Sequence, residues 1–148
     1  MKLIEKNLPR LTIQTTGTNF QQVKITSSSE AADLIRQFYF DDIFLYESFF
    51  ILLLNRANVA IGYAKISQGG ISSTVVDTRL IAHYAVGSLA SSVILAHNHP
   101  SGNLEPSDTD RALTKKIKDG LQILDVDVHD HLILVGGAYL SFADRGIL

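Results

Sequence analysis

The chain has 148 residues, 46% hydrophobic and 19% charged, which predicts a single folded domain over 1–148 and excludes an intrinsically disordered protein. It contains no cysteine, so disulfides, thiolate metal sites and cysteine nucleophiles are excluded, and a transition-metal site would have to use imidazole and carboxylate ligands. The formal net charge of −2 disfavours a protein that is held to DNA by phosphate contacts.

Nothing in the sequence predicts association with a membrane. The N-terminus lacks the continuous apolar segment of a signal peptide, and the longest apolar run, Phe49–Leu54, is far too short to cross a bilayer. We therefore expect a cytoplasmic protein. One cluster of basic residues is interpreted as the solvated face of a helix rather than a nucleic-acid site. Its members are Arg111, Lys115, Lys116 and Lys118.

The hydrophobic pattern predicts strands and helices that alternate along the chain. A capping box at Ser27–Glu30 marks the start of the first helix, and residues 49–54 are apolar on both faces, as in a central strand. The expected elements, in chain order, are a strand near 11–15, a helix over 28–39, strands over 49–54 and 59–66, a helix over 78–90, a strand over 92–96, a helix from about 107 to 124, and strands over 126–134 and 139–142. This interleaving predicts an α/β domain with a mixed sheet covered by helices.

A candidate metal site follows the strand over 92–96. His97 and His99 are two residues apart, and side chains at that spacing in a strand point to one face, so both imidazoles can converge on one ion. A turn at Pro100–Gly102 and a helix that starts near Ser107 then bring Asp110 back towards the sheet. Two imidazoles and one carboxylate leave one position of a tetrahedral zinc ion open, which is the catalytic arrangement.

A competing interpretation uses the same residues for structure alone. Ser107 and Asp110 have the spacing of a helix N-cap, and a carboxylate is favourable near the positive end of a helix. Two histidines can likewise be ordinary polar residues at a strand end. Each element alone is weak, but the complete set with its intervening turn favours a metal site.

A second pair of histidines lies within the expected strand over 126–134. Alternation predicts that Asp127, His129 and His131 share one face of that strand. No turn and no third ligand follow, so we do not expect a second metal centre here. These residues are expected either to contact the ligands of the first site without binding the metal themselves, or simply to be exposed to solvent. His83 lies in the middle of an expected helix, and we assign it no function.

The pattern His97-x-His99, seven residues, Ser107, two residues and Asp110 is the JAMM (MPN+) metalloprotease signature. The string His97–Gly102 followed by Pro106-Ser107 resembles RadC proteins in particular, and three further short segments do so as well. These are Gly69-Gly70, Asp130-His131 and Ser141–Asp144. The resemblance covers about residues 24–148.

The resemblance implies roles for five residues. His97, His99 and Asp110 would bind zinc, and Ser107 would form a hydrogen bond with the reacting oxygen. The JAMM pattern also requires a glutamate at the start of a buried strand, and Glu47 occupies the matching position. The spacing of the sequence gives no link between Glu47 and the distant histidines.

The fold implied by the resemblance is the α/β JAMM (MPN, cytidine-deaminase-like) fold, with a curved mixed sheet flanked by helices. Many RadC proteins carry an N-terminal helix-hairpin-helix module that suggests contact with DNA, and this chain begins too late to hold one, so a stand-alone domain is expected. His129 is a departure, since family members often have leucine there.

The expected function is that of a zinc-dependent hydrolase that cleaves a peptide or isopeptide bond, with a peptide or protein as substrate. Glu47 is expected to act as general base and Ser107 to stabilise the oxyanion, while Asn98 points away from the histidines and has a packing or loop-fixing role. A DNA-processing accessory protein or nuclease, as the family name suggests, and a non-catalytic interaction module remain as alternatives. Binding of DNA by the isolated domain is not expected.

Overall fold

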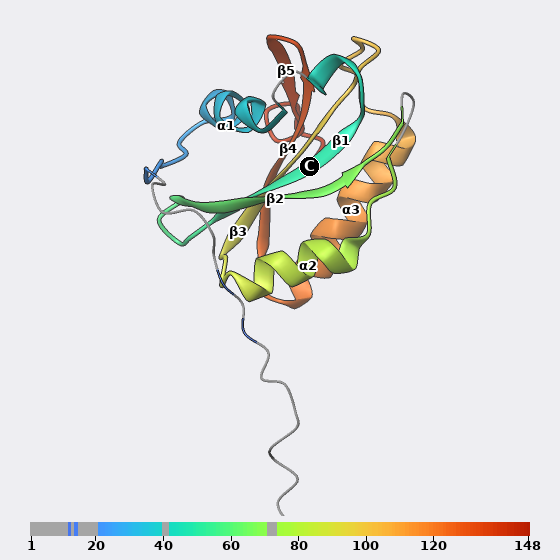
Figure 1. The fold of residues 1–148 in the computed structure, drawn as a ribbon. Helices are drawn as coiled ribbons and strands as arrows, with labels where there is room; N and C mark the ends of the chain where they lie inside the picture. Colours follow the sequence, from blue (N-terminus) through green and yellow to red (C-terminus); the bar gives the residue numbers. More distant parts are fainter. Residues whose placement is uncertain (1–11, 13, 15–20, 40–41, 71–73) are drawn as a thin grey trace, which may run out of the picture.

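The structure, a computed structural model, describes residues 12, 14, 21–39, 42–70 and 74–148. Within these residues five strands form one sheet, and three α-helices and two short 3₁₀ helices surround it (Figure 1). The elements are α1 (Ser28–Arg36), η2 (Gln37–Tyr39), η3 (Asp42–Phe44), β1 (Ser48–Leu54), β2 (Ala60–Gln68), α2 (Thr78–Gly87), β3 (Ser92–Asn98), α3 (Asp108–Ile123), β4 (Asp127–Val135) and β5 (Ala138–Ser141).

The sheet is mixed, with strand order β2-β1-β3-β4-β5. Strands β3 and β4 are parallel, and the other neighbouring pairs are antiparallel. Because parallel strands need a crossover connection, α3 runs back along the sheet between β3 and β4, and its first turn lies beside the end of β3. This places the segment after β3 and the start of α3 at the same edge of the sheet.

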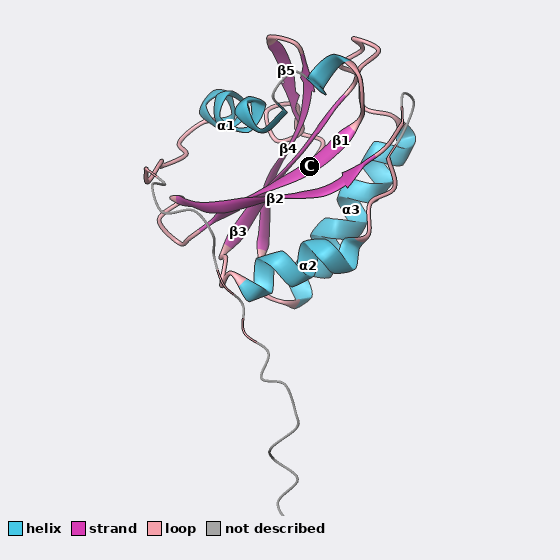
Figure 2. Cartoon of the chain, viewed as in Figure 1, coloured by secondary structure: helices cyan, strands magenta, loops and turns pink. Residues whose placement is uncertain are grey.

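Helices cover both faces of the sheet (Figure 2). Helix α1 packs with Phe50, Leu52 and Leu54 of β1 on one face. Helices α2 and α3 pack with Phe49, Ile51 and Leu53 on the other. β1 is therefore buried on both sides along its whole length, as its unbroken apolar run predicts.

The α/β class and the mixed sheet between helices are confirmed. The first helix begins after the N-cap Ser27, as predicted, but its last turn is the 3₁₀ helix η2. The strand expected near 11–15 lies almost entirely outside the described residues. Among the described residues, none of the helices has the length and apolar character needed to span a bilayer.

Strand β4 contains an irregularity that matters for the site. In its parallel pairing with β3, Val93 lies opposite Val128 but Ile94 lies opposite Asp130, so β4 has one extra residue at His129. Such a bulge reverses which face the following side chains occupy. His131 consequently lies beside Leu95 and His97 on the face covered by α3.

Candidate metal centre

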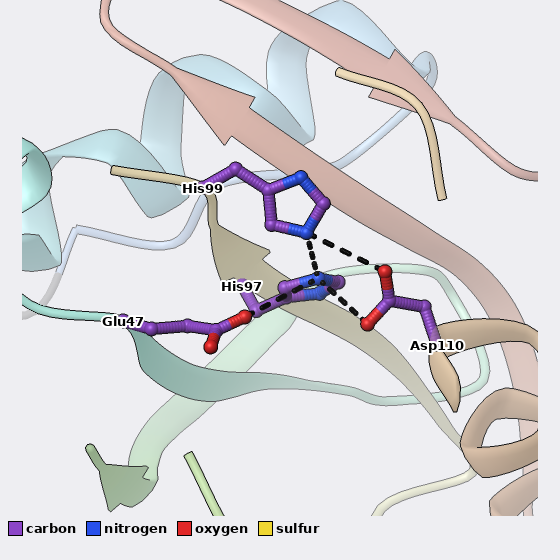
Figure 3. Close-up of side chains that lie close together, drawn as sticks. All are labelled: Glu47, His97, His99 and Asp110. Atoms are coloured by element: carbon purple, nitrogen blue, oxygen red, sulfur yellow. Dashed lines mark hydrogen bonds and ion pairs between the residues drawn. The ribbon is translucent and has the colours of Figure 1, made fainter. Parts of the chain in front are cut away.

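Four side chains from three parts of the chain converge at the edge of the sheet where β1 begins and β3 ends (Figure 3). Glu47 directly precedes β1, His97 lies near the end of β3, His99 follows that strand, and Asp110 lies in the first turn of α3. Each offers one ligand atom, and these atoms lie within 4.8 Å of one another.

The spacing of three of these side chains fits a tetrahedral ion. The Nε2 atoms of His97 and His99 are 2.9 Å apart. The Asp110 carboxylate has Oδ1 at 3.3 Å from His97 Nε2 and Oδ2 at 3.4 Å from His99 Nε2. Ligand atoms around a tetrahedral zinc ion with bonds of about 2.0–2.1 Å lie roughly 3.3 Å apart. The donor set of two imidazoles and one carboxylate therefore fits zinc.

The orientation of the His99 ring is fixed by the turn that follows it. Its Nδ1 lies 2.6 Å from the backbone oxygen of Asn103, and a carbonyl oxygen can only accept, so Nδ1 carries the proton. The lone pair of neutral His99 is then on Nε2, which faces Asp110. Gly102 has φ of +88° in this turn, a conformation that glycine adopts without strain.

Asp110 serves the helix and the cluster at once. Ser107 Oγ accepts from the Asp110 backbone N–H at 3.0 Å, and Asp110 Oδ2 accepts from the Ser107 N–H at 2.8 Å, which completes a capping box. The same carboxylate faces both imidazoles. Burial raises the pKa of Asp110, but His97 and His99 in their protonated form donate to this carboxylate and outweigh burial, so its pKa lies well below the usual range. The cap and the ligand interpretations are thus compatible.

Glu47 lies slightly farther from the other three groups. Its Oε1 is 3.9 Å from His97 Nε2, beyond the distances that join the imidazoles to Asp110. Burial raises the pKa of Glu47, the nearby Asp110 adds to this, and the two imidazoles oppose it. A half-buried carboxyl whose pKa is raised is a suitable proton acceptor and donor.

Asn98 connects the strand of the histidines to the segment that carries Glu47. Its Oδ1 accepts from the Ser48 N–H at 2.8 Å, and its Nδ2 donates to the carbonyls of Ile43 and Tyr46 at 2.7 Å each. Ser48 and Tyr46 are the two chain neighbours of Glu47. The side chain lies on the opposite face from His97 and is fully buried, so the predicted loop-fixing role of Asn98 is confirmed.

His131 lies behind His97. Its Nε2 is 2.8 Å from His97 Nδ1, and its Nδ1 is 2.6 Å from the hydroxyl of Thr114 on α3. Burial holds the pKa of His131 well below its usual value. The sequence left two possibilities for His131, contact with a metal ligand or exposure to solvent. The contacts with His97 and Thr114 favour the first.

The expectation that Asp127, His129 and His131 share one face is wrong. The bulge in β4 puts His131 on the face of His97, while Asp127 and His129 are exposed. Thr114 was not identified from the sequence. Its position four residues after Asp110, on the buried face of α3, was the available signal.

The cluster lies in a cleft of about 570 Å³. Apolar side chains form part of its wall, together with Thr74, Ser101 and Ser107. The apolar residues are Phe49, Val76, Pro100 and Leu113. Among the described residues that line it, the charged ones are acidic or histidine, and none is lysine or arginine.

Two minor expectations from the sequence concern surface residues. Three of the four residues of the basic cluster are exposed on α3, and Lys115 forms an ion pair with Asp119, as expected for a solvated helix face. His83, to which the sequence assigned no function, is exposed on α2 and does not line the cleft.

Comparison with known proteins identifies the family to which the chain belongs. The family model described as the RadC-like JAB domain matches residues 25–147. The chain belongs to this family. The RadC-like JAB domain accounts for most of the chain, and its match includes all four clustered residues and Ser107.

Curated relatives of this RadC-like JAB domain carry the name UPF0758, which states no activity. A protein of Flavobacterium johnsoniae is 44% identical over 124 residues, which are 84% of this chain and 53% of the relative. One of Porphyromonas gingivalis is 48% identical over 69% of this chain and 45% of its own length. The Escherichia coli K12 protein YfjY is 43% identical over 69% of this chain and 64% of its own length. The chain spans about half the length of most of these relatives.

Proposed function

We propose that this domain is a zinc-dependent hydrolase that cleaves a peptide or isopeptide bond. The observation that carries the proposal is the convergence of His97, His99 and Asp110 in a cleft that also holds Glu47. When bound there, a zinc ion supplies a Lewis acid that polarises a carbonyl and lowers the pKa of a coordinated water to about 7.

The protein groups divide the remaining work. Glu47 accepts a proton from the attacking water and returns it to the leaving amine, for which its raised pKa is suited. Ser107 Oγ already accepts from the Asp110 N–H, so its own proton is free to be donated to the oxyanion that forms on the substrate. His97, His99 and Asp110 hold the metal.

The charges of the cleft support an amide substrate over a nucleic acid. A phosphodiester substrate would bring negative charge to Glu47 and Asp110, and among the described lining residues no lysine or arginine is present to compensate. The third acidic lining residue, Glu105, is already paired with Arg145. We therefore propose a peptide or protein as the substrate and no specific binding of DNA by this domain.

Elemental analysis and a cleavage assay test the proposal. Wild-type protein purified without chelator should hold one zinc ion per chain, and His97→Ala and Asp110→Ala should lose it. Zinc-loaded wild type should cleave members of a peptide and isopeptide library, a chelator should abolish cleavage, and added zinc should restore it. Full zinc occupancy in either variant would show that the metal lies elsewhere.

A further inference from the structure

A continuous series of buried polar contacts runs from α3 through β4 to the metal-facing ring on β3. The Thr114 hydroxyl lies 2.6 Å from the backbone oxygen of Asp110 and 2.6 Å from His131 Nδ1. His131 Nε2 then lies 2.8 Å from His97 Nδ1. The three side chains are at most 3% exposed, so water does not compete for these contacts.

The direction of the first contacts follows from the chemistry of the groups. The Asp110 carbonyl can only accept, so the single hydroxyl proton of Thr114 is donated to it. The Thr114 oxygen must then accept in its second contact, and the proton of that contact is on His131 Nδ1. A neutral His131 consequently has its lone pair on Nε2, which faces His97.

We propose that Thr114 and His131 are positioning residues that hold His97 in the tautomer able to bind the metal. The lone pair on His131 Nε2 accepts from His97 Nδ1, which places the His97 proton on Nδ1 and leaves Nε2 free beside Asp110. This inference rests on the proposed metal site. It adds to that proposal the two residues, Thr114 and His131, that do not bind the metal themselves but keep the Nε2 lone pair of His97 available to it.

The same contacts couple two of the proposed ligands. The series begins at the backbone of Asp110 and ends at the ring of His97, so a shift of the first turn of α3 would disturb both. His99 has its own, separate restraint from the Asn103 carbonyl. The Nδ1 proton of His97 is therefore held by His131, and the Nδ1 proton of His99 is held by the Asn103 carbonyl.

The competing explanation is that His131 only fills space between aromatic rings. Its ring stacks on Phe142, with centroids 4.7 Å apart, and meets Phe49 edge-on at 5.4 Å. In that case a phenylalanine of similar shape would serve as well. His131→Phe therefore separates the two explanations, because it keeps an aromatic ring at this position and removes the acceptor for His97.

The test measures zinc binding alone, by competition with a chromophoric chelator, together with the melting temperature of the metal-free protein. We expect His131→Phe to fold but to melt somewhat lower than wild type, because a buried nitrogen of His97 loses its partner. It should bind zinc about 10–100-fold more weakly, as is typical when a hydrogen-bond partner of a metal ligand is removed. Thr114→Val should weaken binding less, and Thr114→Ser, which keeps the hydroxyl, should bind as wild type does. His97→Ala identifies the site that is being measured.

Nitrogen NMR of the histidine rings gives a second readout, in which the zinc-loaded wild type should show His97 protonated at Nδ1. Zinc binding by His131→Phe as tight as that of wild type would overturn the inference and leave the proposed function intact. If His131→Phe fails to fold, equal zinc affinities for Thr114→Val and Thr114→Ser would overturn it instead. A wild-type protein that takes up no zinc would overturn the inference and the proposed function together.

Discussion

Ser107 has one observed task, capping α3, and one proposed task, stabilising the oxyanion, and replacing it by alanine should affect stability and turnover by different amounts. In the structure its Oγ accepts from the Asp110 N–H at 3.0 Å, which caps α3. The reciprocal bond, from the Ser107 N–H to Asp110 Oδ2, uses only the backbone of Ser107 and survives the substitution. Asp110 should therefore stay in place in Ser107→Ala.

The two effects can be estimated from these contacts. Loss of a serine N-cap costs about 1 kcal/mol of folding free energy, which lowers the melting temperature of a domain of this size by roughly 2–4 °C. Loss of one donor to an oxyanion slows turnover by up to about 10²–10³-fold. Zinc affinity should change little, because Ser107 is not a proposed ligand.

Ser27→Ala is the matched control. Ser27 caps α1 in the same way, with Oγ accepting from the Glu30 N–H at 3.2 Å, but it does not line the cleft. It should lower the melting temperature by a similar amount and leave turnover unchanged. Both variants are assayed by calorimetry and on a peptide that wild type cleaves. If Ser107→Ala melted lower yet cleaved at the wild-type rate, Ser107 would be only a cap and its catalytic role would have to be abandoned.

Four further predictions concern other parts of the molecule. Glu47→Gln should keep its zinc by elemental analysis but hydrolyse about 10²–10⁴-fold more slowly, and a fully active variant would place the base elsewhere. Asn98→Asp leaves the carbonyls of Ile43 and Tyr46 without a donor, so it should lower the free energy of unfolding by about 2–6 kcal/mol in a denaturant titration. Unchanged stability would show that these contacts do not hold the segment in place. Asp130 accepts hydrogen bonds from two backbone N–H groups and a hydroxyl. Asp130→Asn keeps an acceptor, so Asp130→Ala should melt clearly lower than Asp130→Asn. Equal melting temperatures would show that these hydrogen bonds do not stabilise the fold. Duplex DNA should bind no more tightly than about 10⁻⁴ to 10⁻⁶ M at physiological salt, and nanomolar binding lost in a Lys115/Lys116 double variant would show that the basic cluster is a binding surface.

Most of the candidate site could be predicted because its parts lie close together in the sequence. His97, His99, Ser107 and Asp110 belong to one strand end, one turn and one helix start, and local spacing rules apply to each. Glu47 reaches the cluster only because β1 pairs with β3, with Phe49 opposite His97. Such long-range register is not visible in spacing, so only the family resemblance identified Glu47.

The positions of His131 and Thr114 show where sequence reasoning failed. Alternation along β4 would be correct in a regular strand, but the extra residue at His129 interrupts the period of two. The local sequence contains no glycine that would mark such a bulge. Thr114 lies on the apolar face of an amphipathic helix, and the contact that links it to the site is with His131 of β4, which is distant in the sequence. No local pattern marks the bulge, and the spacing of Thr114 from Asp110 indicates a buried position but not the strand residue that Thr114 contacts.

The contacts of Asn98 have a consequence for how such a domain can diverge. One buried amide, placed between two proposed metal ligands, holds the chain on both sides of Glu47. The placement of Glu47 relative to the end of β3 is thereby set by buried contacts, whereas part of the cleft wall comes from the side chains of Thr74, Val76 and Glu105. If the proposed hydrolysis takes place, mutations in that wall can alter which molecule is accepted without moving Glu47. Selection for a new substrate and selection for the position of Glu47 would then act on different residues.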